Sequence, residues 1–580
     1  MQLAMLALFL ATIVLTARGA FAAVHPWIAQ LFLITDPLIL LGTALAGAAS
    51  GTLLAALVIV GLSLLAPRAY CGWICPLGTT MDIVDRLLFR RRDRPAGAAP
   101  KLRQMKYALL LALAVLAAFN LGVFGWFDPI CIATRSYATA VYPVVDHAAK
   151  LGLISAERAG SQTAANAYDW ASRNHLVVLD SELKSGAGLA YHWAAVFMAL
   201  FLAILVVQAY QKRFWCRNLC PLGALLGLLG SLSPLRPRVS EKCIACDACR
   251  KGCKTGAFQR DEPDGKYRGL VQECILCYAC ERDFCPVSAI HVGGGSPVPM
   301  RPEPRVMPGR RAFLGAAATG AILGPAMLLD QRTRGKEETA PQLRPPGALR
   351  PDAEFLSACV RCGECIRVCP TNALQPSGIE NGIAGLWTPT FVYNIGACDF
   401  QCAARVREGD PSGAAPVRSL GPYRGGPVNL CAMVCPTEAI ARLTHDEKVK
   451  WKIGTAEFDK NRCLPWARSE ECLTCEEQCP LPEKAISHAT ADVPNREWLK
   501  LSQPARHRYE ELEARQGRLT RDEREELAAL PPKMRPLALP FTLRDRCIGC
   551  GTCENVCPVD GPGGIRVRKL QTQEIKDARR

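Results

Sequence analysis

Residues 243–253 read CIACDACRKGC, and residues 274–286 read CILCYACERDFCP. Each stretch contains three cysteines separated by two residues, followed by a fourth cysteine. Three thiolates with this spacing ligate one [4Fe–4S] cluster, and the fourth thiolate reaches the cluster of the other run. The two stretches therefore predict a compact two-cluster ferredoxin module of the α+β class over residues 239–292.

The eight cysteines of this module form two reciprocal ligand sets. The expected sets are Cys243, Cys246, Cys249 and Cys285, and Cys274, Cys277, Cys280 and Cys253. Zinc is the alternative, because it also takes four thiolates. Zinc sites use two separated CxxC pairs, however, so the even spacing favours iron–sulfur clusters.

Four further cysteine runs lie in the last third of the chain. The first (CVRCGECIRVCP, from residue 359) and the last (CIGCGTCENVCP, from residue 547) are regular, whereas a long insertion divides the second and a wide gap opens the third. In chain order the cysteines are Cys359, Cys362, Cys365 and Cys369; Cys398, Cys402, Cys431 and Cys435; Cys463, Cys472, Cys475 and Cys479; and Cys547, Cys550, Cys553 and Cys557. Nested pairing of the runs, outer with outer and inner with inner, predicts four more [4Fe–4S] clusters.

The divided run has an alternative interpretation. Cys398, Cys402 and Cys431 have unusual spacing, and thiols in an oxidising compartment form disulfides. A disulfide or a lost cluster is therefore the alternative to a cluster at these residues. With this cluster included, the sequence predicts about six [4Fe–4S] clusters in the whole chain.

Two near-duplicate motifs precede the first module. Residues 70–78 read YCGWICPLG, and residues 215–223 read WCRNLCPLG. The CxxxC spacing puts both sulfurs on one face of a helix. The four cysteines, Cys71, Cys75, Cys216 and Cys220, could hold a seventh cluster, act as redox-active dithiols or be structural. The lone Cys131 is expected to be structural.

The composition indicates both membrane and water-soluble parts. The chain has 580 residues, and 49% of them are hydrophobic, which is high for a soluble protein and low for one wholly in the membrane. The net charge of +16 would suit nucleic-acid binding, but the basic residues are unevenly distributed between loops, which favours membrane topology and no nucleic-acid partner. The sequence shows no CxxCH haem motif, flavin site, Walker loop or GxGxxG motif after a strand.

Four apolar segments are long enough, or nearly so, to cross a hydrocarbon core of about 30 Å, which takes about 20 helical residues. They lie near residues 2–17, 38–66, 107–127 and 191–210. Residues 67–106 hold nine Lys or Arg against three Asp, whereas residues 128–190 hold five against six acidic residues. The positive-inside rule therefore makes the first loop cytoplasmic and returns the chain to the cytoplasm near residue 211.

Residues 307–329, MPGRRAFLGAAATGAILGPAMLL, resemble a twin-arginine export signal placed inside the chain. After an even number of spans, Arg310 and Arg311 are expected in the cytoplasm. Folding and cluster insertion there, followed by export, would protect the later cysteines from forming disulfides. The apolar stretch over about 310–329 is then a fifth transmembrane anchor. The alternative is a re-entrant or buried helix with chance arginines.

The predicted fold class is a mixed membrane protein with four to five transmembrane α-helices and two α+β bacterial ferredoxin-like (polyferredoxin) domains. The expected domains are a transmembrane domain (1–238), a cytoplasmic two-cluster module (239–292), a connector with the twin-arginine helix (293–352) and a periplasmic four-cluster domain (353–580). A charged helical stretch near residues 496–530 is interpreted as a solvated insertion.

Residues 40–290, with their paired CxxxCP motifs, resemble the NapH-type (MauN-type) membrane ferredoxins, and residues 307–570 resemble the NapG-type (MauM-type) exported ferredoxins. In that family these are separate subunits of a quinol-oxidising electron-transfer pair, so this chain resembles their fusion. The resemblance implies a component of a quinol dehydrogenase-type oxidoreductase in the bacterial inner membrane. Its expected partners are the membrane quinone pool and a periplasmic reductase, dehydrogenase or cytochrome.

The leading functional expectation is a membrane-bound iron–sulfur conduit from quinol to a periplasmic redox partner. His25 and His192 are candidates for contact with a quinone headgroup. The alternative is a redox assembly or activation factor for a periplasmic metalloenzyme, with a NosR-like or CcoG-like role, because those proteins share the CxxxCP pairs. A scaffold with purely structural clusters is a third interpretation.

Overall fold

The computed structural model describes most of the chain in two compact units. The described residues are 1–16, 26–89, 100–158, 162–163, 166, 191–260, 265–294, 309–334, 343–399, 402 and 428–569. The first unit comprises Met1–Thr390, Gln401–Ala414 and Arg424–Thr444, and the second comprises Phe391–Phe400, Ala415–Tyr423 and His445–Arg580.

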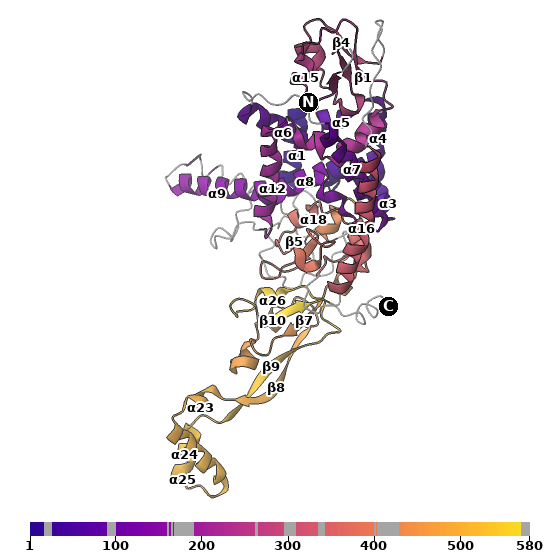
Figure 1. Cartoon of the computed structure of the whole chain (residues 1–580). Helices are drawn as coiled ribbons and strands as arrows, with labels where there is room; N and C mark the ends of the chain where they lie inside the picture. The colour runs from indigo at the N-terminus through magenta and orange to yellow at the C-terminus, as the bar shows by residue number, and fades with distance from the viewer. Residues whose placement is uncertain are drawn as a thin grey trace. The chain divides into compact units, whose positions relative to one another are not determined.

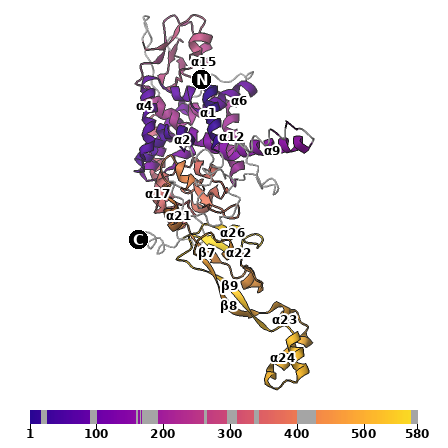
Figure 2. The same ribbon diagram turned by 180° about the vertical axis from the view of Figure 1, so that it is seen from behind.

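A layer of apolar helices forms the middle of the first unit (Figure 1). Its longer elements are α1 (Gln2–Leu15), α2 (Pro26–Ile34), α3 (Pro37–Leu45), η2 (Gly51–Ala55), α4 (Ala56–Leu65), α7 (Pro100–Ala118), η3 (Val123–Trp126), α8 (Pro129–Ser136), η4 (Tyr137–Val141), α9 (Tyr142–Arg158), α12 (Ala194–Val206) and η5 (Val207–Ala209). Helix α9 projects sideways from this layer in both Figure 1 and Figure 2. The layer contains the four apolar segments expected from the sequence.

These segments form broken helices rather than continuous spans. Among the described residues, only Arg310–Asp330 is a single helix long and apolar enough to cross a membrane, and α2 with α3 passes the same test as a pair bent by 81°. The bend lies directly before Pro37, which cannot continue the hydrogen bonding of the preceding helix. The expected four to five transmembrane helices are therefore not confirmed by the structure, because breaks shorten the individual helices.

Both CxxxCP motifs fold into the same pair of short helices. The first motif forms α5 (Ala69–Trp73) and α6 (Pro76–Leu88), and the second forms α13 (Phe214–Asn218) and α14 (Pro221–Gly230). In each copy the proline is the first residue of the second helix, where its fixed φ and missing N–H are tolerated. The duplicated sequence thus gives a duplicated turn.

The first cysteine module is a small α+β unit, as expected. Strand β1 (Arg236–Val239) pairs antiparallel with β4 (Ile290–Gly293), so the two ends of the module close on each other. Between them lie α15 (Ala248–Gly252), β2 (Phe258–Arg260), β3 (Tyr267–Gly269), η6 (Val271–Glu273) and η7 (Cys280–Phe284). The buried rings of Phe258 and Tyr267 pack with the cysteines in one core.

A second cysteine-rich segment of the first unit lies at the opposite end of the helical layer (Figure 1). Its elements are α17 (Asp352–Ala358), α18 (Glu364–Arg367), β5 (Leu374–Pro376), η8 (Ile379–Asn381), β6 (Pro389–Phe391) and α20 (Leu430–Met433). The contacts agree with this arrangement, because Lys106 near the start of α7 binds the first module and Gly122 beyond its end receives a hydrogen bond from Arg361. At about 1.5 Å per helical residue, the two attachment points are well separated.

Helix α16 (Arg310–Arg334) packs along α7. A Cβ on Gly320 would lie 2.8 Å from Val115, and one on Gly324 would lie 2.5 Å from Phe119. These glycines form a GxxxG pattern, which lets two helices approach closely. Because residue numbers rise together in both helices, α16 runs parallel to α7 and leads towards the second cysteine-rich segment.

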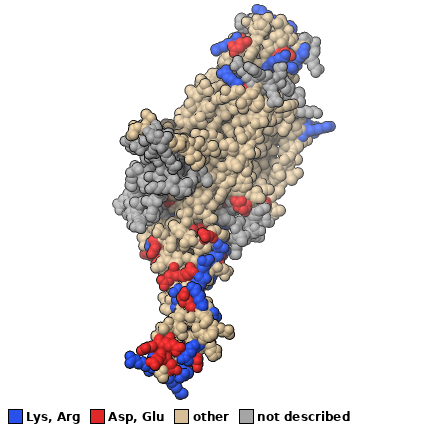
Figure 3. Space-filling view, turned by 90° about the vertical axis from the view of Figure 1, so that its left-hand side faces the viewer, with Lys and Arg blue, Asp and Glu red and all other residues tan. Residues whose placement is uncertain are grey.

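The second unit contains the last two cysteine runs and a long hairpin. Its elements are α21 (His445–Lys450), β7 (Thr455–Phe458), η9 (Leu464–Arg468), α22 (Thr474–Glu477), β8 (Ile486–Pro494), α23 (Arg496–Lys500), α24 (Gln503–Ala514), η10 (Gln516–Arg518), α25 (Arg521–Ala529), β9 (Met534–Thr542), α26 (Thr552–Asn555) and β10 (Ile565–Arg568). Strands β8 and β9 pair antiparallel, and charged helices follow at the tip, as expected for a solvated insertion (Figure 3).

Candidate iron–sulfur sites

The first module brings its first expected ligand set together. Its four cysteines line one pocket together with apolar side chains such as Val239 and Ile290; they are Cys243, Cys246, Cys249 and Cys285. The main-chain N–H of Ala289 donates to the sulfur of Cys285 at 3.1 Å. Hydrogen bonds to the sulfurs are one of the means by which a protein tunes a cluster.

The second expected set of this module also converges. Cys274, Cys277 and Cys280 interact electrostatically with one another and with Cys253, and Ala257 N–H donates to the Cys253 sulfur at 3.2 Å. The binding loops of both sets contain paired left-handed residues, namely Ala245 and Asp247 in one and Leu276 and Tyr278 in the other. This backbone curvature forms the concave loops that bind anionic groups.

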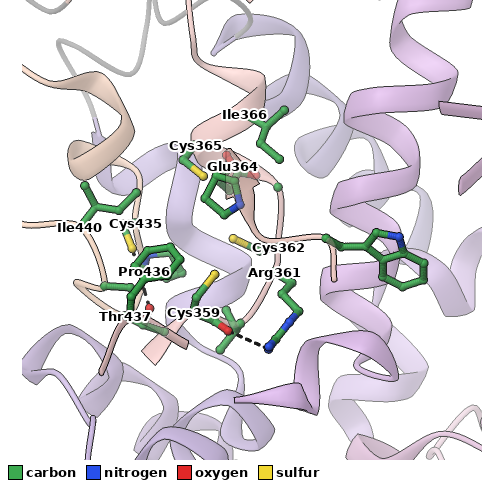
Figure 4. Close-up of a pocket in the computed structure, with 16 residues that line it drawn as sticks. Cys359, Arg361, Cys362, Glu364, Cys365, Ile366, Cys435, Pro436, Thr437 and Ile440 are labelled. Carbon is green, nitrogen blue, oxygen red and sulfur yellow. Dashed lines mark hydrogen bonds between the residues drawn. The ribbon is translucent and has the colours of Figure 1, made fainter. Parts of the chain in front are cut away.

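Figure 4 shows the corresponding site at the other end of the helical layer. The sulfurs of Cys359, Cys362, Cys365 and Cys435 point into one pocket. Arg361 lies in the same loop and donates to the carbonyl of Cys359 at 3.0 Å. The first run of this region is therefore completed by the last cysteine of the second run.

The second unit has the same arrangement. One pocket of this unit is lined by Cys547, Cys550 and Cys553 together with Cys479. Cys463, Cys472 and Cys475 interact in turn with Cys557, whose sulfur accepts the N–H of Gly564 at 3.2 Å. The third and fourth runs are therefore reciprocal partners.

The expected nested pairing is wrong. Runs that are adjacent in the sequence pair with each other, the first with the second and the third with the fourth. The reason is the local backbone: Gly347 and Ala441 bond main chain to main chain in the first unit, while β7 and β10 pair in the second. Each pairing therefore closes within a single unit.

The divided run has its cysteines in two units. Cys402 is buried beside Val368 and Leu430, and the N–H of Leu430 donates to its sulfur at 3.4 Å. Cys431 lies within electrostatic reach of Cys365 in this unit. Cys398 belongs to the second unit, where its N–H donates to the carbonyl of Cys550 at 2.8 Å. Residues 403–427, between these cysteines, lie outside the described part of the chain.

The cysteine sets described above fit an iron–sulfur cluster better than a single metal ion. All 29 cysteines are described, and none forms a disulfide. In the described part of the chain, no three His, Cys, Asp or Glu side chains approach closely enough to hold one ion. Burial raises the pKa of Cys249, Cys274 and Cys475 to about 12 and that of Cys550 to about 11. Such buried thiolates need a positively charged core, which iron supplies.

The four cysteines of the CxxxCP motifs also converge. Cys71, Cys75, Cys216 and Cys220 are all buried and lie within electrostatic reach of one another. Each motif holds the other through an arginine: Arg68 donates to the carbonyl of Cys216 and Arg213 to that of Cys71, both at 3.1 Å. This reciprocal exchange fixes the two copies face to face.

Buried ion pairs attach the first module to this four-cysteine site. Glu273, next to Cys274, is fully buried and bonds both Arg68 and Lys106 at 2.7 Å. Trp73 donates to the carbonyl of Leu276 at 3.2 Å. Sequence analysis did not identify these charged residues, because Lys106 and Arg68 resemble ordinary basic residues of a cytoplasmic loop.

At the other end, two buried arginines attach the Cys359 loop. Arg135 donates to the carbonyl of Arg361 at 3.0 Å and packs on the ring of Trp387, 4.4 Å from its centroid. Cys131, expected to be structural, is fully buried here within electrostatic reach of Cys362. Of the two histidine candidates, His192 is exposed and its main-chain N–H donates to Gln375, whereas residue 25 lies outside the described part of the chain.

Three family profiles described as 4Fe-4S binding domains match the chain. One matches residues 50–95 and 193–239, which contain the two CxxxCP motifs; the second matches 355–375 and 542–561, and the third matches 240–256. Ferredoxin-type iron–sulfur domains are therefore present on both sides of α16. The two CxxxCP motifs therefore lie within a region that matches a 4Fe-4S binding domain.

The chain is similar to several curated proteins over different parts of its length. It is 30% identical to the ferredoxin-type protein NapG of Escherichia coli (strain K12) over 271 residues, which is 45% of this chain and 86% of NapG. It is 33% identical to the methylamine utilization ferredoxin-type protein MauM of Methylorubrum extorquens over 204 residues, 31% of this chain and 88% of MauM. The chain belongs to the family of NapG and MauM ferredoxin-type proteins.

A second relative accounts for a further part of the chain. The methylamine utilization ferredoxin-type protein MauN of Methylorubrum extorquens is 30% identical over 246 residues, 41% of this chain and 65% of MauN. Homologues of both kinds are consistent with a fusion of a NapH/MauN-type with a NapG/MauM-type protein. No solved structure matches the chain. The chain is an iron–sulfur electron-transfer protein with multiple [4Fe–4S] ferredoxin domains.

Proposed function

We propose that this protein is bound to the bacterial inner membrane, oxidises quinol and passes the electrons to a periplasmic redox partner. The observation that carries the proposal is the distribution of cysteine sets in the first unit. One pair of sets lies at the start of α7, the set of Cys359 lies beyond its end, and the four CxxxCP cysteines lie in the helical layer. Such an arrangement suits transfer across the layer.

The surface of the helical layer supports a membrane location. Figure 3 shows a broad face without Lys, Arg, Asp or Glu, bounded by charged side chains. Large aliphatic side chains are exposed on α4, α12 and α16; they include Leu57, Val58, Leu200, Val206, Ile322 and Leu329. Exposed apolar surface of this extent marks a membrane or protein contact. Broken helices are tolerated at membrane depth where their ends are buried in protein.

The connector supports placement of the two ferredoxin parts on opposite sides. Arg310 and Arg311 are exposed at the first turn of α16, and α16 follows α7 to the other end of the layer. If α16 spans the bilayer, the first module is cytoplasmic and residues 353–580 are periplasmic. The twin-arginine route would then carry the folded, cluster-loaded domain.

Six [4Fe–4S] clusters would be held by the six ferredoxin runs, and a seventh by the four CxxxCP cysteines. When bound, the clusters supply one-electron carriers, which suit the two-electron oxidation of a quinol in single steps. The chain's own part is to bury the thiolates, to donate main-chain N–H groups to the sulfurs and to surround them with fixed charges. The buried pair of Arg68 and Lys106 against Glu273 leaves one excess positive charge beside Cys274, and nearby positive charge favours the reduced state.

Quinol reduction of the clusters tests this function. Membranes containing the full-length protein are mixed with a reduced quinol analogue, and the iron–sulfur signals are followed by low-temperature electron paramagnetic resonance. The proposal expects signals that grow with quinol and are lost in a Cys277→Ser variant for the cluster of that set. If quinol reduces no cluster although dithionite does, the quinol-oxidising function is wrong.

The alternative function, activation of a periplasmic metalloenzyme, is favoured by the four buried CxxxCP thiols, which could also act as dithiols. Deletion of the gene separates the two functions. Loss of electron flow to a fully metallated partner supports the conduit, whereas an inactive and under-metallated partner supports activation.

A further inference from the structure

Two carboxyl groups are buried in the helical layer away from every cysteine set described above. Asp36 lies at the break between α2 and α3, and Asp128 lies directly before α8. Both side chains are 0% exposed. Asp36 Oδ1 accepts the N–H of Leu38 at 2.7 Å, and Asp128 Oδ2 accepts the N–H of Cys131 at 2.6 Å. Each carboxyl therefore caps the N-terminus of one helix.

The other oxygen of each carboxyl is left without a partner. Asp36 Oδ2 and Asp128 Oδ1 are both buried, and neither has a hydrogen-bond partner in the described part of the chain. The two carboxyls lie within electrostatic reach of each other, and the elements that carry them are neighbours, because α2 contacts α8 and α3 contacts η3. Two ionised carboxylates have no hydrogen to share, and two negative charges in a buried site repel strongly. A proton on one of the two carboxyls would remove this repulsion.

Titratable groups of α5 and α8 lie near this pair. Tyr70, which precedes the first CxxxC motif, is 1% exposed and interacts electrostatically with both carboxyls and with Cys71 and Cys75. Its hydroxyl has no hydrogen-bond partner among the residues that the structure describes. On the other side, Cys131 interacts with both carboxyls and with Cys362. The pair thus lies between the four-cysteine site and the loop of Cys362.

A buried arginine of α8 lies near the pair. Arg135 lies within electrostatic reach of Asp128, but its guanidinium donates to the carbonyl of Arg361 at 3.0 Å and packs between the rings of Phe197 and Trp387. In the described part of the chain, the guanidinium makes no hydrogen bond to either carboxyl. Burying a carboxyl pair inside a helical layer is costly, which makes the pair a candidate functional site.

We propose that Asp36 and Asp128 form a proton-binding site that holds one proton at rest and binds a second when the neighbouring four-cysteine site gains an electron. The proposal rests on the proposed function, in which quinol supplies that electron. One electron and one proton from water then enter together, so the net charge of the buried region does not change. Both leave when the electron passes to the next oxidised carrier.

The geometry favours a proton over a metal cation as the ligand. The N-termini of α3 and α8 direct their N–H groups at the two carboxyls, and the positive end of a helix repels cations. A sodium or calcium ion would need several further oxygen ligands. A shared proton needs only the two unpartnered carboxyl oxygens.

Infrared spectroscopy of the full-length, cluster-loaded protein tests the resting proton. We expect a carbonyl stretch of a protonated carboxyl at pH 7 that shifts in D₂O and disappears in both Asp36→Asn and Asp128→Asn. The matched control is Asp446→Asn, whose side chain is 82% exposed and which should leave the band unchanged. The conservative Asp128→Glu variant should retain a band of a protonated carboxyl. If the wild-type protein lacks this band, the proposal is overturned.

Redox titrations at several pH values test the second proton. Dithionite and ferricyanide serve as the redox reagents. The reduction potential of one couple should fall by about 59 mV per pH unit, because a tenfold change in proton concentration shifts a couple that binds one proton per electron by that amount. The slope should flatten in Asp128→Asn. An unchanged slope in both Asn variants, or a potential that follows sodium concentration at fixed pH, overturns the proton site. Because these reagents replace quinol, intact carboxyl signals without quinol reduction would contradict only the proposed function.

Discussion

Gly72 and Ile275 touch backbone to backbone: the carbonyl oxygen of Ile275 occupies the space where a side chain on Gly72 would begin. Gly72 lies between Cys71 and Cys75, and Ile275 lies between Cys274 and Cys277. Two sulfur-rich loops from distant parts of the chain therefore meet without an intervening side chain.

A methyl group at position 72 should push these loops apart. We expect Gly72→Ala to destabilise the attachment of the first module by about 1–3 kcal/mol, the usual cost of overpacking. The electron paramagnetic resonance signal of the Cys274 set should shift or broaden. Gly61→Ala is the matched control, because no heavy atom lies within 4 Å of a Cβ at that position. Equal spectra for both variants would contradict the close approach.

The corrected pairing of the last four runs makes a spectroscopic prediction. Cys435→Ser should remove the same cluster signal as Cys362→Ser, because both cysteines line one cavity. Cys479→Ser should likewise match Cys550→Ser. Iron analysis and electron paramagnetic resonance of the four purified variants check both statements. Under nested pairing, Cys557→Ser would match Cys362→Ser instead, and that result would refute the pairing seen in the structure.

Glu273 should be essential for attachment of the first module. Glu273→Gln leaves the buried cations Arg68 and Lys106 without their carboxylate, and breaking a buried ion pair costs about 3–5 kcal/mol. We expect loss of the Cys274-set signal and a lower unfolding temperature in detergent. The control is Glu241→Gln, whose 64% exposed side chain pairs with Lys266 at the surface and should change stability by about 0–1 kcal/mol.

The same carboxylate predicts an acid limit. Burial alone would raise the pKa of Glu273, but Lys106 and Arg68 hold it below the ordinary value of 4.5. A lowered folded pKa means that the stabilisation is complete above pH 4.5 and is lost as the pH falls through the folded value. Fluorescence of Trp73, isolated by subtracting a Trp73→Phe variant, should report this detachment. In Glu273→Gln the transition should be absent from this range.

The structure brings together the cysteine sets that the sequence predicts for the first module, because such sets are largely local: three cysteines at even spacing form one tight loop. Pairing between distant runs is different, since nested and adjacent pairing use the same cysteines. The choice between nested and adjacent pairing depends on two backbone contacts: the hydrogen bond between Gly347 and Ala441, and the pairing of strands β7 and β10. Neither contact leaves a signal in cysteine spacing.

The helical layer could be predicted as apolar but not as broken. A hydropathy window averages over Pro37 and over the left-handed Gly47, so it reports one segment where the chain turns. The burial of charged residues could not be predicted either, because Asp36, Asp128 and Glu273 resemble loop residues in the sequence and only the fold encloses them. These residues violate the local rule that charged side chains are exposed. Functional sites are expected at positions that violate such a rule.

The glycines of α16 provide the last prediction. A leucine at Gly320 or Gly324 would collide with Val115 or Phe119 of α7, so each variant should separate the two helices and destabilise the first unit by about 1–3 kcal/mol. Gly315→Leu is the matched control on the same helix, because no heavy atom lies within 4 Å of a Cβ there and the added side chain would be accommodated at the surface. The unfolding temperature in detergent measures the destabilisation, and the rate of protease cleavage after residue 334 measures the separation of the two helices. If Gly315→Leu destabilises the protein as much as Gly324→Leu, the loss reflects added bulk in the helix and not its contact with α7.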